Sequence, residues 1–111
     1  MTEGMEPEER LEQQLREEYG WLYDRLTEIL YAHDIVGLAA LESPEDEYSV
    51  EVDKFLPLLP EIQSSASLSQ VLYEVFVRMF GKEVIPHKSA KFDALAEDVW
   101  KTYQSWRNEQ T

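Results

Sequence analysis

Residues 67–81, SLSQVLYEVFVRMFG, decide the fold class of this chain. Their apolar residues return at intervals of three and four positions, the spacing of one helix face: Leu68, Val71, Leu72, Val75, Phe76 and Met79. Ser67 and Gln70 have the form of a capping box, and Gly81 stands where a C-terminal cap is expected. The stretch therefore predicts a helix that buries a broad apolar stripe.

Three further segments repeat this spacing. The first predicts a helix from Pro7 to about Ala32, in which Gly20 marks either a kink or a break into two helices. The second covers about 50–59 and meets Pro57, which removes a backbone donor and bends or ends a helix. The last follows Ser89, a suitable N-cap, and we expect a polar tail after it.

No run of alternating β-branched residues is long enough to predict a sheet. The 111 residues suit one domain, and a 43% hydrophobic content can supply its core. We therefore predict an all-α fold: a small single domain of about four helices over residues 1–111, with a structured acidic central loop. Residues 1–6 and 108–111 are predicted to be frayed.

Composition excludes several classes of protein. There is no Cys, which removes disulfides and Cys-ligated metal sites. The first residues are acidic and lack the apolar core of a signal peptide, and no apolar run is long enough to span a membrane. We therefore expect a cytoplasmic protein.

The charge is strongly acidic, with 23 acidic and 10 basic residues and a net charge of −13. This balance argues against binding to nucleic acid or to an anionic membrane. It favours solubility and steers basic partners toward the chain, although a well-solvated surface has the same composition. The basic residues that gather after residue 77 are interpreted as a solvated loop rather than an anion site: Arg78, Lys82, Lys88 and Lys91.

The densest acidic run lies in the central stretch 33–48, HDIVGLAALESPEDEY, and just after it. Six acids and no base stand between Glu42 and Asp53. Acids around an aromatic anchor are a reasonable interface composition, so we predict a partner-binding site made of Glu45, Asp46, Glu47, Tyr48 and Glu51. The alternative is that the acids cap helices and Tyr48 fills the core. Asp34 and Gly37 are predicted to have structural roles.

Catalytic and metal-binding motifs are weak. No Ser lies in a Gly-x-Ser-x-Gly elbow, and the two His residues stand in no recognisable triad. The acids do not have the spacing of an EF-hand or a di-iron bundle. We therefore predict no enzyme, no metal site and no cofactor. One alternative is a metal-dependent or carboxylate-based enzyme using the acids of the central stretch: Asp34, Glu45, Asp46 and Glu47.

A resemblance to a known family lies in the same stretch. The pattern Asp-x-x-Gly-Leu at 34–38, followed by Pro-Glu-Asp-Glu-Tyr at 44–48, resembles the YugE-like family of small bacterial helical proteins. That family usually has Asp-Pro-Ile-Gly where this chain has Asp-Ile-Val-Gly. Residues 50–59 and 73–81 are also similar, and the resemblance covers about 22–107. It implies an all-α fold and no established activity.

The functional prediction is a non-enzymatic acidic interaction protein, of inhibitor or immunity type, that binds a basic protein partner. A second alternative to it is a structural subunit that forms homodimers through exposed aromatic residues such as Trp21, Tyr31 and Trp106. An acidic surface spread over convex helices favours the first hypothesis, whereas acids that converge in a cleft favour an enzyme.

Overall fold

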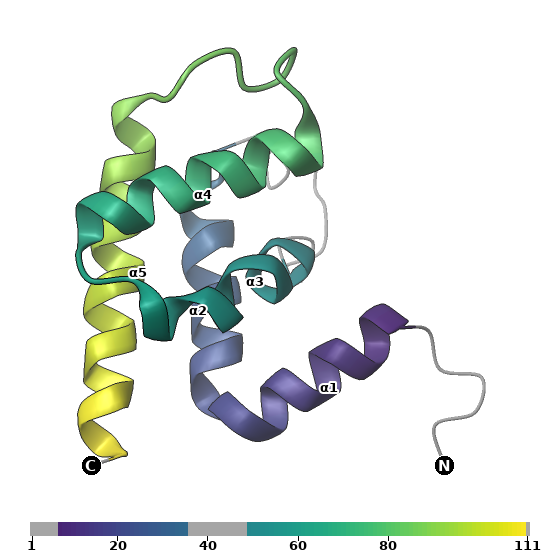
Figure 1. Ribbon diagram of the computed structural model, residues 1–111, viewed down its shortest axis with the longest axis vertical. Helices are drawn as coiled ribbons and strands as arrows, with labels where there is room; N and C mark the ends of the chain where they lie inside the picture. Colours follow the sequence, from purple (N-terminus) through teal and green to yellow (C-terminus); the bar gives the residue numbers. More distant parts are fainter. Residues whose placement is uncertain (1–6, 36–48, 111) are drawn as a thin grey trace.

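The computed structural model describes residues 7–35 and 49–110, shown as coloured ribbons in Figure 1. In these two ranges the chain forms five α-helices and one 3-10 helix, and it forms no β-strand. The predicted all-α class is therefore confirmed. The elements are α1 (Pro7–Tyr19), α2 (Trp21–His33), α3 (Ser49–Phe55), η3 (Leu56–Glu61), α4 (Ser65–Phe80) and α5 (Ala90–Glu109).

The chain breaks between α1 and α2 at Gly20, so the first of the four expected helices is two helices. Gly20 has φ 58° and ψ −130°, which side chains of L-residues strongly disfavour. Its N–H still donates to the carbonyl of Arg16 at 2.9 Å, and its own carbonyl accepts from the N–H of Tyr23 at 3.3 Å. The break therefore changes the helix direction with little loss of backbone hydrogen bonding.

Prolines shape the next junction. The α-helical part of the second segment, α3, ends at Phe55, two residues before Pro57, as the missing proline donor requires. The chain continues as η3 rather than ending near Leu59. Side chains three positions apart face the same way in a 3-10 helix, and accordingly Leu56 and Leu59 are buried while Leu58 is exposed.

The start of α4 differs from the prediction. Ser64 is the N-cap, and its Oγ accepts from the N–H of Ser67 at 3.1 Å. The predicted capping box at Ser67 is wrong because the first turn already begins at Ser65. The predicted C-terminal cap is confirmed: Gly81 has φ 84°, and its N–H donates to the carbonyl of Val77 at 2.7 Å.

Helix α5 begins as predicted, because Ser89 Oγ accepts from the N–H of Lys91 at 3.3 Å. It continues to Glu109, so residues 108–109 are helical and not part of a frayed tail. The helix runs beside α2, and α4 crosses both of them in Figure 1, while α3 lies between α4 and α1. This arrangement places one face of every helix against a common core.

The core is almost entirely aliphatic and aromatic. Phe92 contacts Phe76 edge to face at 5.7 Å and Tyr73 at 5.6 Å between ring centroids, and these rings join α4 to α5. The largest side chains that are fully buried come from α2 to α5 and η3: Tyr23, Phe55, Phe76, Phe92, Leu22, Leu26, Leu30, Leu56, Leu59, Leu68 and Leu72. In the described part of the chain, no helix is long and apolar enough to cross a membrane.

Candidate interaction surfaces

The predicted acidic site falls mostly outside the described residues. Gly37 and the four residues Glu45 to Tyr48 belong to 36–48, as does most of the predicted central loop. Asp34 is described and has a structural position: it is the C-cap of α2 in a left-handed conformation, φ 46° and ψ 50°, and its N–H donates to the carbonyl of Leu30 at 2.9 Å. Asp is one of the few residues that accept this conformation readily.

Glu51 does not lie on the surface, where a charge that attracts a partner must lie. Glu51 is 2% exposed and lies in the first turn of α3, between exposed Val50 and buried Val52. A buried carboxyl group contributes little to the long-range field and cannot contact a partner. This burial argues against the expected role of Glu51 in binding. Glu51 lies four positions before buried Phe55, on the face of α3 that turns toward the interior.

Asp53 belongs to a polar cluster that joins three helices. The Tyr23 hydroxyl donates to Asp53 Oδ1 at 2.6 Å and lies 3.2 Å from Glu12 Oε1. Burial raises the pKa of Asp53, and the bond from Tyr23 only partly opposes this shift. Burial also raises the pKa of Tyr23 far above its ordinary value, with the hydrogen bond to Asp53 adding to it.

The same cluster is closed by a guanidinium group. Arg16 lies over the Tyr23 ring, 4.4 Å from its centroid, and pairs with Glu12 at 3.5 Å and with Asp24. Tyr23 is 0% exposed and Asp53 is 6% exposed, so the contact between them lies inside the protein. The cluster holds α1, α2 and α3 together. Nowhere in the described ranges do three His, Asp or Glu side chains gather as metal ligands.

Charge is divided unequally along the chain. Residues 1–53 contain 16 acidic and 3 basic residues, whereas residues 54–111 contain 7 of each. The whole net charge of −13 therefore belongs to the first half. The two described helices that lie wholly in that half, α1 and α2, contain seven acidic and three basic residues and form an acidic arm.

The first candidate surface lies where this arm meets the end of α5, at the bottom of Figure 1. The Trp21 indole N–H donates to Glu109 Oε1 at 3.3 Å, and Trp21 is 44% exposed. Tyr19 contacts Trp106 at 5.2 Å between centroids, which fixes the two helices against each other. We call this area the elbow surface and define it by Glu17, Glu18, Tyr19, Trp21, Trp106 and Glu109.

Two carboxylates act on the aromatic residues of the elbow surface: Glu109 accepts a hydrogen bond from Trp21, and Glu18 acts on Tyr19 through its charge. The pKa of Tyr19 is raised by burial first and by the charge of Glu18 second. Arg16, the cation nearest in sequence, is already bound to Glu12 and Asp24. Among the residues that the structure describes, Glu17 and Glu18 form no ion pair. The elbow surface therefore offers an exposed indole beside uncompensated negative charge.

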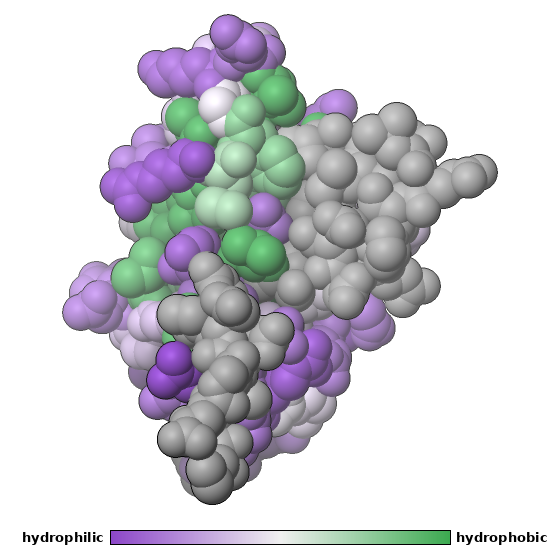
Figure 2. Space-filling model, turned by 90° about the vertical axis from the view of Figure 1, so that its right-hand side faces the viewer, coloured by the Kyte–Doolittle hydropathy of each residue, from purple (hydrophilic) through white to green (hydrophobic). Residues whose placement is uncertain are grey.

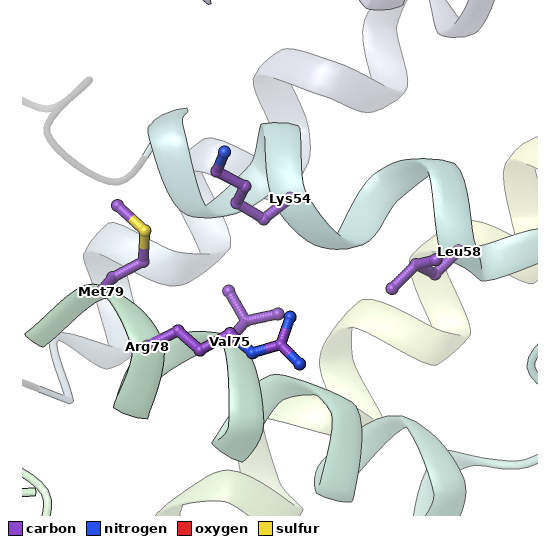
Figure 3. A pocket seen from close by; sticks show the side chains of 5 residues that line it. All are labelled: Lys54, Leu58, Val75, Arg78 and Met79. Carbon is purple, nitrogen blue, oxygen red and sulfur yellow. The ribbon is translucent and has the colours of Figure 1, made fainter. Parts of the chain in front are cut away.

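The second candidate surface is a groove between α3–η3 and α4. Figure 3 shows the residues that line it: Lys54 and Leu58 come from one wall, and the labelled side chains of α4 come from the other. Its cavity measures about 330 Å³. We call it the α3–α4 groove and define it by Lys54, Leu58, Val75, Arg78 and Met79.

Apolar atoms also gather on one face of the molecule beyond this groove. Figure 2 shows them in the upper half of that face, bordered by hydrophilic side chains. The C-terminal end of α4 and the following loop contribute exposed apolar residues, with Met79 38% exposed and Val84 54% exposed. Neither helix periodicity nor motif reading singled out these positions as a surface, because Met79 lies on the edge of the buried stripe of α4.

Comparison of the chain with protein-family models, curated proteins and solved structures found no match.

Proposed function

We propose that this chain is a non-enzymatic interaction protein whose elbow surface binds a basic segment of a protein partner. The observation that carries the proposal is Trp21: a 44% exposed indole whose N–H is held by Glu109 from the opposite end of the chain. Exposed, fixed Trp residues are frequent binding hot spots.

An arginine or lysine side chain suits this surface on two grounds. Its cation can lie over the face of Trp21, an attraction of about 0.5–1 kcal/mol at exposed sites. Its charge is also favoured by the nearby carboxylates of Glu18 and Glu109. The indole N–H fixes one oxygen of Glu109, which orients the carboxylate in advance.

The net charge supports the same class of partner. A charge of −13 raises the local concentration of cationic molecules and increases their association rate. Because exposed charges are screened within about 8 Å at physiological ionic strength, binding should weaken as salt increases. The predicted acids Glu45, Asp46 and Glu47 would add to this field.

The other predicted functions have less support. Of the carboxylates expected in an enzyme, Asp34 caps α2, and the other three lie outside the described residues. A homodimer through Trp21 and Trp106 uses the elbow surface itself, and it is therefore an outcome that the experiment must separate from binding a basic segment.

Nuclear magnetic resonance of the indole N–H groups tests the proposal. The chain has three Trp residues, and the Trp21 signal is assigned as the one lost in Trp21→Phe. An Arg-Gly repeat peptide should shift the Trp21 signal saturably, and a Glu-Gly repeat peptide should not. A homodimer would instead shift this signal with protein concentration in the absence of peptide.

A matched pair of variants controls for net charge. Glu17→Gln, Glu18→Gln and Glu109→Gln together remove three acids of the elbow surface, and Glu61→Gln, Glu74→Gln and Glu83→Gln remove three exposed acids elsewhere. At about 0.2–1 kcal/mol for each exposed charge, the elbow triple should bind roughly tenfold more weakly than the control triple. Equal affinities of the two triples would contradict the proposal.

A further inference from the structure

The α3–α4 groove carries an inference that is independent of the elbow surface. Its walls are two neighbouring helical segments that run in opposite directions in Figure 1. Each wall contributes side chains four positions apart: Lys54 and Leu58 on one, Val75 and Met79 on the other. Val75 and Met79 form a ridge on α4, against which the side chains of another helix can pack. Lys54 and Leu58 face this ridge from α3 and η3.

The groove is apolar at its floor and open at its rim. Val75 is 8% exposed and forms part of the core, whereas Leu58 and Met79 are 40% and 38% exposed. Leu58 faces outward because its 3-10 neighbours Leu56 and Leu59 face inward. The exposed pair therefore follows from the local geometry of η3 and keeps its place while the core remains intact.

Two cations stand in these apolar walls. In the ranges that the structure describes, neither Lys54 nor Arg78 forms a salt bridge, although the chain contains 23 acidic residues. Figure 3 shows the Arg78 guanidinium extending beside Val75 toward Leu58. The charge of Lys54 acts on Asp53 without forming a salt bridge with it. The groove therefore carries a local positive charge in a protein whose net charge is negative.

We propose that the α3–α4 groove binds an acidic amphipathic helix of a partner protein. Apolar side chains spaced three and four positions apart would occupy the cavity between Leu58, Val75 and Met79, and carboxylates beside them would pair with Lys54 and Arg78. A helix laid in a groove between two helices is an established mode of peptide recognition. A basic helix, the class assigned to the elbow surface, is repelled here by both cations.

Selection from a displayed peptide library tests the inference. The library encodes amphipathic helices about 15 residues long, near the length at which an isolated helix begins to form, with acidic, neutral and basic polar faces. We expect binders that depend on the groove to have acidic polar faces. A selection that yields no acidic binder overturns the proposal.

The position of the bound peptide is determined from the nuclear magnetic resonance signal of one methyl group. Met79 is one of three methionines, and its methyl signal is assigned as the one lost in Met79→Leu. A selected acidic peptide should shift the Met79 methyl signal saturably and leave the Trp21 indole signal unchanged. Shifts at Trp21 alone would place the peptide on the elbow surface and overturn the proposal.

A second pair of variants keeps the total charge equal. Lys54→Glu with Arg78→Glu reverses the groove cations, and Lys101→Glu with Arg107→Glu reverses two exposed cations on α5. The groove variant should lose at least about tenfold in affinity for the acidic peptide relative to the α5 variant, a difference of about 1.4 kcal/mol. Equal losses would show a non-specific charge effect and overturn the proposal, and thermal unfolding verifies that both variants fold.

Discussion

Two carboxyl groups in this protein accept a hydrogen bond from a hydroxyl at nearly the same distance, yet their pKa values shift in opposite directions. Tyr23 donates to Asp53 at 2.6 Å, between α2 and α3, and Ser69 donates to Asp93 at 2.7 Å, between α4 and α5. The pKa of Asp53 is raised, mainly by burial. The pKa of Asp93 is lowered by the bond from Ser69 first and by Lys88 second.

The difference teaches that burial decides the direction of the pKa shift. At Asp53 burial outweighs the bond from the hydroxyl, whereas at exposed Asp93 the bond from the hydroxyl lowers the pKa with little opposition. Asp53 is 6% exposed and its stabilising bond is outweighed by lost hydration. The Asp93 side chain is 61% exposed and also accepts from Lys88 Nζ at 3.0 Å. The Tyr23–Asp53 contact joins α2 to α3 in the interior, and the Ser69–Asp93 contact joins α4 to α5 at the surface.

The largest effect on stability should come from removing a core contact between α4 and α5, the two helices that the Ser69–Asp93 pair joins. Phe76→Ala deletes a buried ring that contacts Phe92 edge to face, without touching Ser69 or Asp93. We expect a loss of about 3–5 kcal/mol in the free energy of unfolding, measured by urea titration. Glu74→Ala, on the exposed face of the same helix, is the control and should change stability little. A nearly neutral Phe76→Ala would mean that the α4–α5 contact is not a core contact.

The free energy of unfolding should fall more when the buried Tyr23–Asp53 pair loses its hydroxyl than when the exposed Ser69–Asp93 pair does. Tyr23→Phe keeps the ring and leaves buried Asp53 without this donor, at an expected loss of about 1–3 kcal/mol. Ser69→Ala should have a smaller effect, because Asp93 keeps Lys88 and water as partners. Thermal and urea unfolding of the two variants compare them directly. A larger loss for Ser69→Ala would reverse our interpretation.

The two carboxyl groups should also give opposite pH dependence. Folded Asp53 holds its proton more tightly than the unfolded residue, so the stability it contributes falls as pH rises from about its ordinary pKa of 3.8 through the raised value. Folded Asp93 holds its proton less tightly, so its contribution is present above 3.8 and is lost as pH falls through the lowered value.

Urea titrations from pH 2.5 to pH 7 measure this contrast, as the difference between the wild type and each of Asp53→Asn and Asp93→Asn. The wild-type advantage over Asp53→Asn should decline with rising pH, and the advantage over Asp93→Asn should grow. Slopes of the same sign would contradict the assignment of burial as the dominant cause at Asp53.

The smallest effect concerns Lys88. Lys88→Met removes an exposed partner of Asp93, and exposed pairs contribute little to stability. Its effect should be visible in titration instead: the pKa of Asp93, followed by carboxyl carbon resonances, should rise toward its ordinary value. It should not reach that value, because Ser69, the larger cause of the shift, remains. An unchanged pKa would mean that Lys88 exerts no influence on this carboxyl group.

Much of the fold could be predicted because helix periodicity is a strong local signal. Most of the apolar stripe of α4 is buried as expected, and Ser89 and Gly81 cap their helices. Two members of the stripe differ: Val71 is only partly buried, and Met79 is exposed. The start of α4 is harder to predict because four serines stand close together, and sequence alone does not say which hydroxyl meets a free N–H. At Gly20 the sequence does not distinguish a kink from a break, because a glycine inside a helical pattern is compatible with both outcomes.

The candidate surfaces were harder to predict because they depend on contacts between distant residues. Trp21 was named as an exposed aromatic, yet its bond to Glu109 joins residues 88 positions apart. Glu51 was interpreted as a surface acid from the charge run around it, whereas the period of α3 places it inside. Leu58 is exposed because the chain continues as a 3-10 helix. Pro57 predicts that the α-helix bends or ends there, but it does not predict which conformation follows. The predicted acids of 45–47 and the resemblance to the YugE-like family remain predictions.

The turn at Gly20 has a consequence for the handedness of the residue that can occupy it. A Cβ built there meets nothing within 4 Å, so space is not what restricts the position. The mirror image of its φ and ψ, −58° and 130°, is the polyproline II conformation, which L-residues adopt readily. The backbone at Gly20 is therefore that of a relaxed D-amino acid. Glycine, the one encoded residue without a chiral α-carbon, is the nearest equivalent that translation can supply, and the elbow surface depends on the direction it gives to α2.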